Sequence, residues 1–208
     1  NLGESFIFEE PALLLIVERM PATMELALFA LLIAVVIGIP LGMFAGFRPE
    51  SITAKTIMSG SILGFSLPSF WVGIMMMVLF AVHLGWLPST GRGPTSEWFG
   101  IEVSFTSWEG ISYLLMPAIN LSLFKLALVI RLARAGTREV VHQDYIKFAR
   151  AKGLSGRRIV LVHVFKNILI PVVTVLGLEF GGLVAFSIVT ETVFAWPGMG
   201  KLLIDSIG

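Results

Sequence analysis

The sequence predicts an all-α membrane protein: a polytopic helical bundle with four spans and short cytoplasmic helices. Composition is the first observation behind this prediction, because 56% of the 208 residues are hydrophobic, 14% are charged and the mean hydropathy is +0.88. A soluble domain of this length needs far fewer apolar residues to build its core. The second observation is that the apolar residues gather in four runs, each long enough for the roughly 20 residues that a membrane-crossing helix needs.

The predicted spans cover residues 22–47, 54–82, 111–130 and 167–190. Prolines lie within these runs, among them Pro40, Pro68 and Pro171. Proline breaks soluble helices, but membrane spans tolerate it where neighbouring helices satisfy the freed carbonyl groups. Four buried helices of a large soluble enzyme are the alternative, and the length and apolarity of the runs disfavour it.

Two charges fall well inside the predicted spans, Lys125 in the third and Glu179 in the fourth. A charge in the hydrocarbon is costly, so each needs a partner or water. Because these two spans are antiparallel neighbours in sequence, a Lys125–Glu179 ion pair is one interpretation, and a role along a solute pathway is the other. We expect Glu179 to be buried among helices rather than to face lipid.

Charge asymmetry predicts the orientation of the spans. Nine of the 15 Lys and Arg residues lie in residues 131–166, so the positive-inside rule places this loop in the cytoplasm. Alternation then places three segments outside: 1–21, the loop 83–110, and 191–208, which we expect to be re-entrant. Four tryptophans in or beside these segments are expected to anchor them at the membrane–water interface: Trp86, Trp98, Trp108 and Trp196.

Glycines recur every four residues in three of the spans. This spacing places small residues on one helical face, where they let the backbones of neighbouring helices approach closely. The residues predicted to pack helices in this way are Gly38, Gly42, Gly46, Gly60, Gly64, Gly177 and Gly181. Packing within the bundle is the favoured interpretation, and a dimer contact or the lining of a solute path is the alternative.

The cationic loop contains a helix–turn–helix pattern. Residues 144–152 are predicted to form a short helix that Gly153 ends in a left-handed conformation. Ser155 would cap a second helix that begins near Arg157. Contact with anionic lipid headgroups explains the positive charge. It does not explain why Ala149 and Gly153, one helical turn apart, are both small, and this pair indicates a face that receives another protein.

Several classes of function find no support in the sequence. The chain has no cysteine, which excludes disulfides and thiolate metal sites, and its three histidines are scattered. It has no G-x-x-x-x-G-K-[ST] loop for a nucleotide, and no span carries a histidine near an acid, as an intramembrane hydrolase would need. We therefore expect no enzyme activity, no cofactor or metal in this chain, and no nucleic-acid partner. An ion-coupled secondary transporter is the alternative function, although one intramembrane glutamate is thin support for it.

Six segments in order carry a family resemblance. Residues 144–174, DYIKFARAKGLSGRRIVLVHVFKNILIPVVT, resemble the cytoplasmic EAA loop of ABC-importer permease subunits, in the form used by the dipeptide, oligopeptide and nickel group. The other segments resemble further signatures of that group: PATMELAL (21–28), SLPSFWVG (66–73), GWLPSTG (85–91), MPAINLSL (116–123) and ETVFAWPGMGKLL (191–203). Each is weak alone, and their common order makes the resemblance specific. Lys147 and Phe148 depart from the generic motif, which has Glu and Ala there.

The resemblance implies a type I ABC-importer permease fold for residues 22–208. The implied function is that of a transmembrane permease subunit in an ATP-driven importer of peptides or a related small solute such as nickel. The short helix of the loop would dock into an ATP-binding subunit, which would hold the ATP and Mg. The implied docking residues are Asp144, Tyr145, Phe148, Ala149, Lys152, Gly153 and Arg157.

Further partners and a location follow from the same resemblance. They are a second homologous permease subunit, an extracytoplasmic solute-binding protein and the lipid bilayer of the cell inner membrane, which the protein crosses several times. Members of the family usually have six spans. We therefore expect this four-span chain to be a fragment of a longer subunit.

Overall fold

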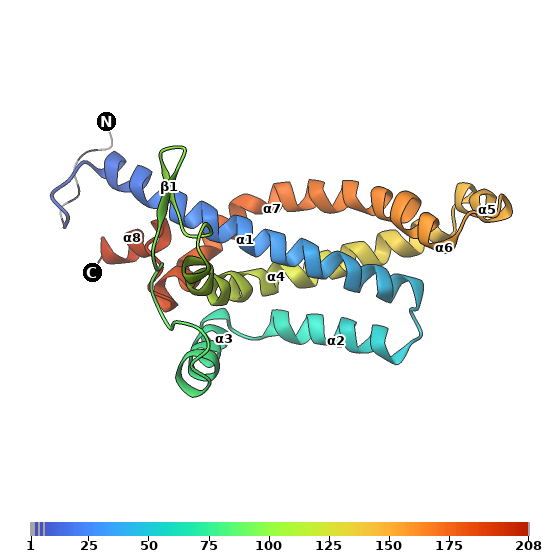
Figure 1. The fold of residues 1–208 in the computed structure, drawn as a ribbon, viewed down its shortest axis with the longest axis horizontal. Coiled ribbons are helices and arrows are strands. Elements are labelled where there is room, and N and C mark those ends of the chain that lie inside the picture. The colour runs from blue at the N-terminus through green and yellow to red at the C-terminus, as the bar shows by residue number, and fades with distance from the viewer. Residues whose placement is uncertain (1–2, 4, 6, 208) are drawn as a thin grey trace. The chain divides into compact units, whose positions relative to one another are not determined.

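The structure of the protein, a computed structural model, describes residues 3, 5 and 7–207. Its residues form two compact units. Unit 1 comprises Asn1–Ala30, Leu67–Ser122 and Phe180–Gly208, and unit 2 comprises Leu31–Ser66 and Leu123–Glu179. Figure 1 shows three long helices, α1 (Ala12–Phe47), α4 (Trp108–Val141) and α7 (Phe165–Val193). The sequence boundary between the two units falls within each of them.

Three continuous helical stretches in the described chain are long and apolar enough to cross a membrane: Ala12–Phe47, Trp108–Val141 and Gly156–Val193. They contain the first, third and fourth predicted spans and extend beyond them. The first begins ten residues earlier than predicted because the sequence ALLLIVERM (12–20) is itself apolar and free of helix breakers. The last gains α6 (Gly156–Arg158) and the π-helix η2 (Ile159–Val164) ahead of α7.

The second predicted span is interrupted. α2 (Ile52–Ser66) ends before Pro68, and α3 (Ser69–Met76) begins after it and continues as the π-helix η1 (Met77–His83). Pro68 has a φ of −61° and a ψ of 129°, which is extended backbone. It also lacks the N–H of a continuous helix and disfavours helical geometry in the preceding residue. The second predicted run, 54–82, which Pro68 interrupts in the sequence, is thus a pair of helices with a break at this proline, and it makes a fourth crossing if the pair is one broken span.

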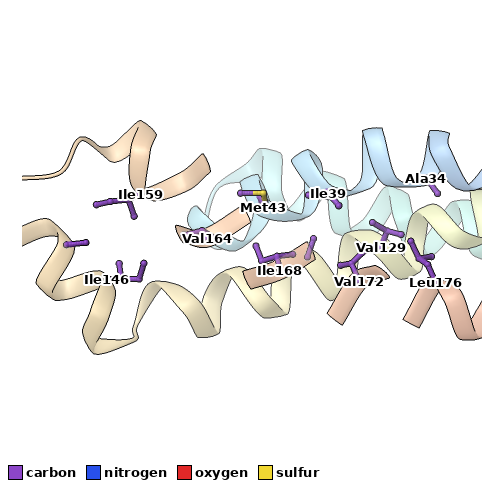
Figure 2. Packing of buried hydrophobic residues seen from close by; sticks show 12 residues of the cluster. Ala34, Ile39, Met43, Val129, Ile146, Ile159, Val164, Ile168, Val172 and Leu176 are labelled. Atoms are coloured by element: carbon purple, nitrogen blue, oxygen red, sulfur yellow. The ribbon is translucent and has the colours of Figure 1, made fainter. Parts of the chain in front are cut away.

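Unit 2 has an apolar core. Its buried side chains come from α1, α4, α5 (Asp144–Ala151), η2 and α7 (Figure 2). They are Ala34, Ile39, Met43, Val129, Ala133, Ile146, Ala149, Ile159, Val164, Ile168, Val172 and Leu176. The core thus includes α5 and η2, so apolar contacts seat the short helix of the cationic loop against the long helices.

Glycines bring α1 close to α4 within unit 2. Gly38, Gly42 and Gly46 lie one turn apart along α1, and each faces α4. A Cβ atom added to Gly42 would lie 2.5 Å from the carbonyl oxygen of Ile130, closer than atoms can approach. The predicted packing role of this first stripe is confirmed.

The remaining glycines of the predicted stripes do not approach a helix of this chain. An added Cβ atom would meet nothing within 4 Å, in the part of the chain that the structure describes, at Gly60, Gly64, Gly177 and Gly181. Packing within this chain is therefore the wrong interpretation for these four residues, because their faces are open. The four-residue interval between glycines predicts a smooth helix face, but it does not predict which helix packs on that face. A contact with another subunit, or with a solute path, stays a prediction.

Unit 1 adds a β-hairpin and a C-terminal helix to the long helices. β1 (Ser96–Trp98) pairs antiparallel with β2 (Ile101–Val103), and Trp98 lies opposite Ile101. In the segment expected to be re-entrant, 191–208, α7 continues to Val193 and α8 (Met199–Asp205) follows. α8 and the residues that follow β2 form hydrogen bonds with the first half of α1, and these bonds build a polar core.

Candidate functional site

α5 has the boundaries that the cationic loop predicts. It spans Asp144–Ala151, and Gly153 follows with a φ of +75°, a left-handed conformation that favours glycine. The N–H of Gly153 donates to the carbonyl oxygen of Arg150 at 2.9 Å, which closes the helix end. Ser155 caps α6 by accepting a 3.4 Å hydrogen bond from the N–H of Arg158. The predicted helix stop and helix cap are both confirmed.

α5 has one buried and one exposed face. Ile146 and Ala149 are 0% and 5% exposed and belong to the core of unit 2. Tyr145 and Phe148 are 42% and 61% exposed. The prediction that Ala149 contacts a partner is therefore wrong, because Ala149 lies three residues after Ile146 on the side that packs inward. The face open to a partner carries large aromatic rings.

Charged side chains accompany these rings. Lys152 Nζ lies 4.6 Å from the centroid of the Phe148 ring, within cation–π range. Lys147 Nζ donates a 2.8 Å hydrogen bond to Asp144 Oδ1, and this bond, with the positive charge, lowers the pKa of the Asp144 carboxyl below its ordinary value. Arg157 is exposed as well, in α6. The exposed side of this segment thus combines aromatic rings with charges of both signs.

The two intramembrane charges form an ion pair within unit 2. Lys125 Nζ lies 2.6 Å from Glu179 Oε2, which confirms the predicted pairing. The side chain of Lys125 is 12% exposed, whereas that of Glu179 is 47% exposed. The prediction that Glu179 is buried is wrong for this chain, because the carboxylate meets its partner at the surface. In contact with lipid tails such a charge costs about 2.5–3.5 kcal/mol, so this carboxylate requires polar surroundings.

A fully buried carboxylate organises the C-terminal part of unit 1. Glu191, in the last turn of α7, is 0% exposed. Thr23 Oγ1 and Ser187 Oγ donate to it at 2.7 and 2.8 Å. The backbone N–H groups of Gly200 and Lys201 donate to it at 2.7 and 3.2 Å. These N–H groups belong to the first turn of α8, where a helix favours a negative charge. Glu191 therefore connects α1, α7 and α8.

A second buried carboxylate fixes the loop before α4. Glu25 is 5% exposed, and Arg92 Nη2 lies 2.7 Å from its Oε2. The N–H groups of Ser104 and Phe105 donate to its Oε1 at 2.6 and 3.1 Å. The Arg92 guanidinium also lies 5.7 Å from the centroid of a Trp196 ring. Hydrogen bonds of this kind offset the cost of burying an ion pair, and they hold the base of the hairpin against α1.

Trp196 belongs to this polar core. It is 0% exposed, and its Nε1–H donates to the carbonyl oxygen of Ala22 at 2.9 Å. The prediction that Trp196 is an interfacial anchor is wrong, because the turn after α7 folds the indole onto α1. The other three tryptophans of the outer segments, Trp86, Trp98 and Trp108, are exposed.

Sequence reasoning missed the buried carboxylates as a site. Glu25 and Glu191 lie inside the segments PATMELAL and ETVFAWPGMGKLL, and Arg92 directly follows GWLPSTG. An acidic residue within an apolar helix needs hydrogen-bond donors if it is buried. The position of Glu25 in an apolar run was therefore the sequence signal that could have predicted a buried, hydrogen-bonded carboxylate. Some of the donors lie far away in sequence, Thr23 168 residues from Glu191 and Arg92 67 residues from Glu25, so these pairings become visible only in the fold.

Membrane-length helices, an exposed short helix in a cationic loop and a hydrogen-bonded polar core define a multi-pass membrane protein. The chain belongs to the family described as the binding-protein-dependent transport system inner membrane component, which matches residues 38–208. The predicted resemblance to ABC-importer permeases is thereby confirmed.

Named relatives are permeases for peptides. The chain is 40% identical over 219 residues to the di/tripeptide transport system permease protein DppB of Pseudomonas aeruginosa. It is 36% identical over 222 residues to the dipeptide transport system permease protein DppB of Escherichia coli K12. Both matches cover 100% of this chain, but they cover 65% and 66% of the relatives. The chain therefore spans just under two thirds of the length of these relatives.

A solved structure supports the fold independently. The MetNI methionine ABC transporter, in inward-facing conformations, matches with a TM-score of 0.68 at 20% sequence identity. The match covers 93% of this chain and 80% of the other. The predicted type I importer permease fold is confirmed.

Proposed function

We propose that this chain is part of the transmembrane permease subunit of an ATP-driven peptide importer, in which it forms half of the translocation path. The observation that carries the proposal is the similarity of the whole chain to dipeptide permeases, at 36–40% identity. The same fold would serve a related small solute such as nickel.

The proposed assembly follows from the family. ATP and Mg would be bound by separate ATPase subunits, and the chain itself would carry no cofactor. A second homologous permease subunit would complete the path, and an extracytoplasmic solute-binding protein would deliver the solute. The location would be the cell inner membrane. Residues 131–166 would lie in the cytoplasm, because the positive-inside rule places Lys- and Arg-rich loops there.

α5 is the segment that we propose docks on the ATPase subunit. Tyr145 and Phe148 expose large aromatic surfaces on a helix of eight residues. Aromatic rings are enriched at the centres of protein interfaces because they bury much area at little entropic cost. Ala149 would contribute indirectly: together with Ile146 it packs into the core of unit 2 and so holds α5 against the long helices.

The test uses the full-length permease with its ATPase subunits and solute-binding protein. Phe148→Asp should release the ATPase subunits during purification and lower ATP-dependent dipeptide uptake by at least about tenfold, because it places a charge in an aromatic contact. Arg150→Ala is the matched control, since Arg150 is exposed on the same helix but two residues on, and so faces another direction. It should leave both measurements near the wild-type values.

Two outcomes would contradict the proposal separately. A wild-type permease that copurifies with no ATPase subunit, or that supports no dipeptide uptake, contradicts the proposed function. A Phe148→Asp complex with full ATPase retention and full uptake contradicts docking through the aromatic face of α5 and leaves the peptide-import function standing.

A further inference from the structure

We propose that the carboxylate of Glu179 binds the ammonium group of a peptide in transit, and that Lys125 is the positioning residue that holds this carboxylate in place. The role rests on the proposed function as a peptide permease, because a peptide carries an N-terminal ammonium group at neutral pH. Glu179 would then be a contact on the translocation path of this chain.

The depth of the pair within the membrane is the first argument. Glu179 lies near the middle of the apolar run 167–190 of α7, about 17 Å from either end at a rise of about 1.5 Å per residue. At that depth the surroundings of a bundle are lipid tails, which do not solvate a charge. The surface that carries Glu179 therefore faces water or another polar group.

The orientation of the pair is the second argument. The side chain of Lys125 is nearly covered, whereas that of Glu179 is about half exposed. Lys125 occupies Oε2, and the described residues provide no hydrogen-bond donor to Oε1. The pair thus presents its negative end outward, with one oxygen available to a donor. A primary ammonium, which has three donors and no acceptor, complements that oxygen.

Room beside the carboxylate is the third argument. Gly182 lies three residues after Glu179, on the same side of α7. A Cβ atom added to Gly182 would meet nothing within 4 Å of it. A solute can therefore approach the carboxylate next to this glycine. Because Lys125 already offsets part of the charge, the ammonium is held weakly enough to leave again, as passage requires.

Exchange of the two charges separates ligand binding from structural pairing. In the full reconstituted complex, Lys125→Glu combined with Glu179→Lys keeps an ion pair but turns the positive end outward. We expect this double variant to assemble with its partners and to take up alanyl-alanine about tenfold more slowly than the wild type, since a charge-assisted hydrogen bond is lost. Glu179→Gln, which keeps the shape and removes the charge, should show a similar loss.

Wild-type uptake by the exchanged variant would overturn the proposal, because the pair would then serve structure alone. A wild-type complex that takes up no alanyl-alanine contradicts the proposed function instead. These two failures are therefore distinguishable in the same assay.

Thiol labelling decides the matter if the exchanged variant does not assemble. The chain contains no cysteine, so Gly182→Cys introduces one thiol beside the carboxylate and leaves Glu179 in place, and the partner subunits are prepared without cysteine. A water-soluble methanethiosulfonate should modify this thiol, and saturating alanyl-alanine should slow the modification at least fivefold. Leu176→Cys is the buried control, since Leu176 is 3% exposed, and should not react. An unreactive thiol at 182, or a rate that the dipeptide does not change, would overturn the proposal.

Discussion

Unit 1 and unit 2 differ in where they hold the carboxylates described above: unit 1 buries them, and unit 2 leaves one exposed. Unit 1 buries two carboxylates, Glu25 and Glu191, and surrounds them with donors from the backbone and from side chains. Unit 2 has an apolar core and leaves the carboxylate of Glu179 open. Hydrogen bonds are directional, so a satisfied polar network specifies one arrangement, whereas apolar packing is non-directional. Unit 1 is thus held by directional hydrogen bonds, whereas α5 in unit 2 is seated by two apolar side chains, Ile146 and Ala149.

The largest effect should come from opening the polar core of unit 1. Glu191→Leu leaves the N–H groups of Gly200 and Lys201 and the hydroxyl group of Thr23 without their acceptor, whereas the hydroxyl group of Ser187 can still donate to the carbonyl oxygen of Val184. Each buried polar group left unpaired costs about 1–3 kcal/mol, and the sum approaches a protein stability of about 5–15 kcal/mol. Thermal unfolding in detergent should show no folded population, or a Tm lowered by more than about 10 °C.

Glu191→Gln is the control for that variant. The amide keeps one acceptor oxygen in the same shape, so its Tm should lie between those of the wild type and Glu191→Leu. Equal Tm values for the two variants would show that the hydrogen bonds of Glu191 contribute little, and the contrast between the two units would then fail.

A smaller effect should follow from changing the close approach of α1 and α4 in unit 2. Gly42→Ala adds a methyl group 2.5 Å from the carbonyl oxygen of Ile130, and the helices must separate at a cost of about 1–3 kcal/mol. Gly60→Ala is the matched variant, because its methyl group would meet nothing within 4 Å. It should be neutral or gain up to about 1 kcal/mol from helix propensity. A comparison of Tm values checks the pair, and equal losses would mean that another subunit covers Gly60.

The smallest effect should come from the helix stop after α5. Gly153→Ala imposes a Cβ atom on a φ of +75°, which costs about 1 kcal/mol and loosens the end of α5. Gly156→Ala is the control, since an added Cβ atom at Gly156 also meets open space and the residue lies in α6. Dipeptide uptake per ATP hydrolysed should fall for Gly153→Ala and not for Gly156→Ala. If uptake per ATP hydrolysed is unchanged in both variants, a less well-defined C-terminal end of α5 does not affect the coupling of ATP hydrolysis to uptake.

Local rules predicted much of this structure. The end of α5 at Gly153 and the cap at Ser155 depend on neighbouring residues only, and both are confirmed. The direction in which Ala149 points depends on what covers α5, and small size alone led to the wrong face. Partners far apart in sequence were beyond such rules: Glu25 and Arg92 are 67 residues apart, and only the fold brings them together.

Glycine spacing shows the same limit of prediction from local sequence. The interval of four residues predicted a smooth helix face correctly in α1, where α4 covers it. In α2 and α7 the same interval leaves the glycines open. The glycine spacing in one chain predicts that a helix has a smooth face. It does not predict which helix, subunit or solute contacts that face.

The π-helix η2 has a consequence for how motion is passed along the chain. In its last turn the N–H of Phe165 donates to the carbonyl oxygen of Val160, five residues back, so its hydrogen bonds are one residue out of step with those of an α-helix. A return to the α-helical pattern shifts the register by one residue, which is about 1.5 Å along the axis and about 100° around it. Because η2 lies between the loop of α5 and the start of α7, such a shift of register would turn α7 about its axis and translate it relative to α5 by that single step.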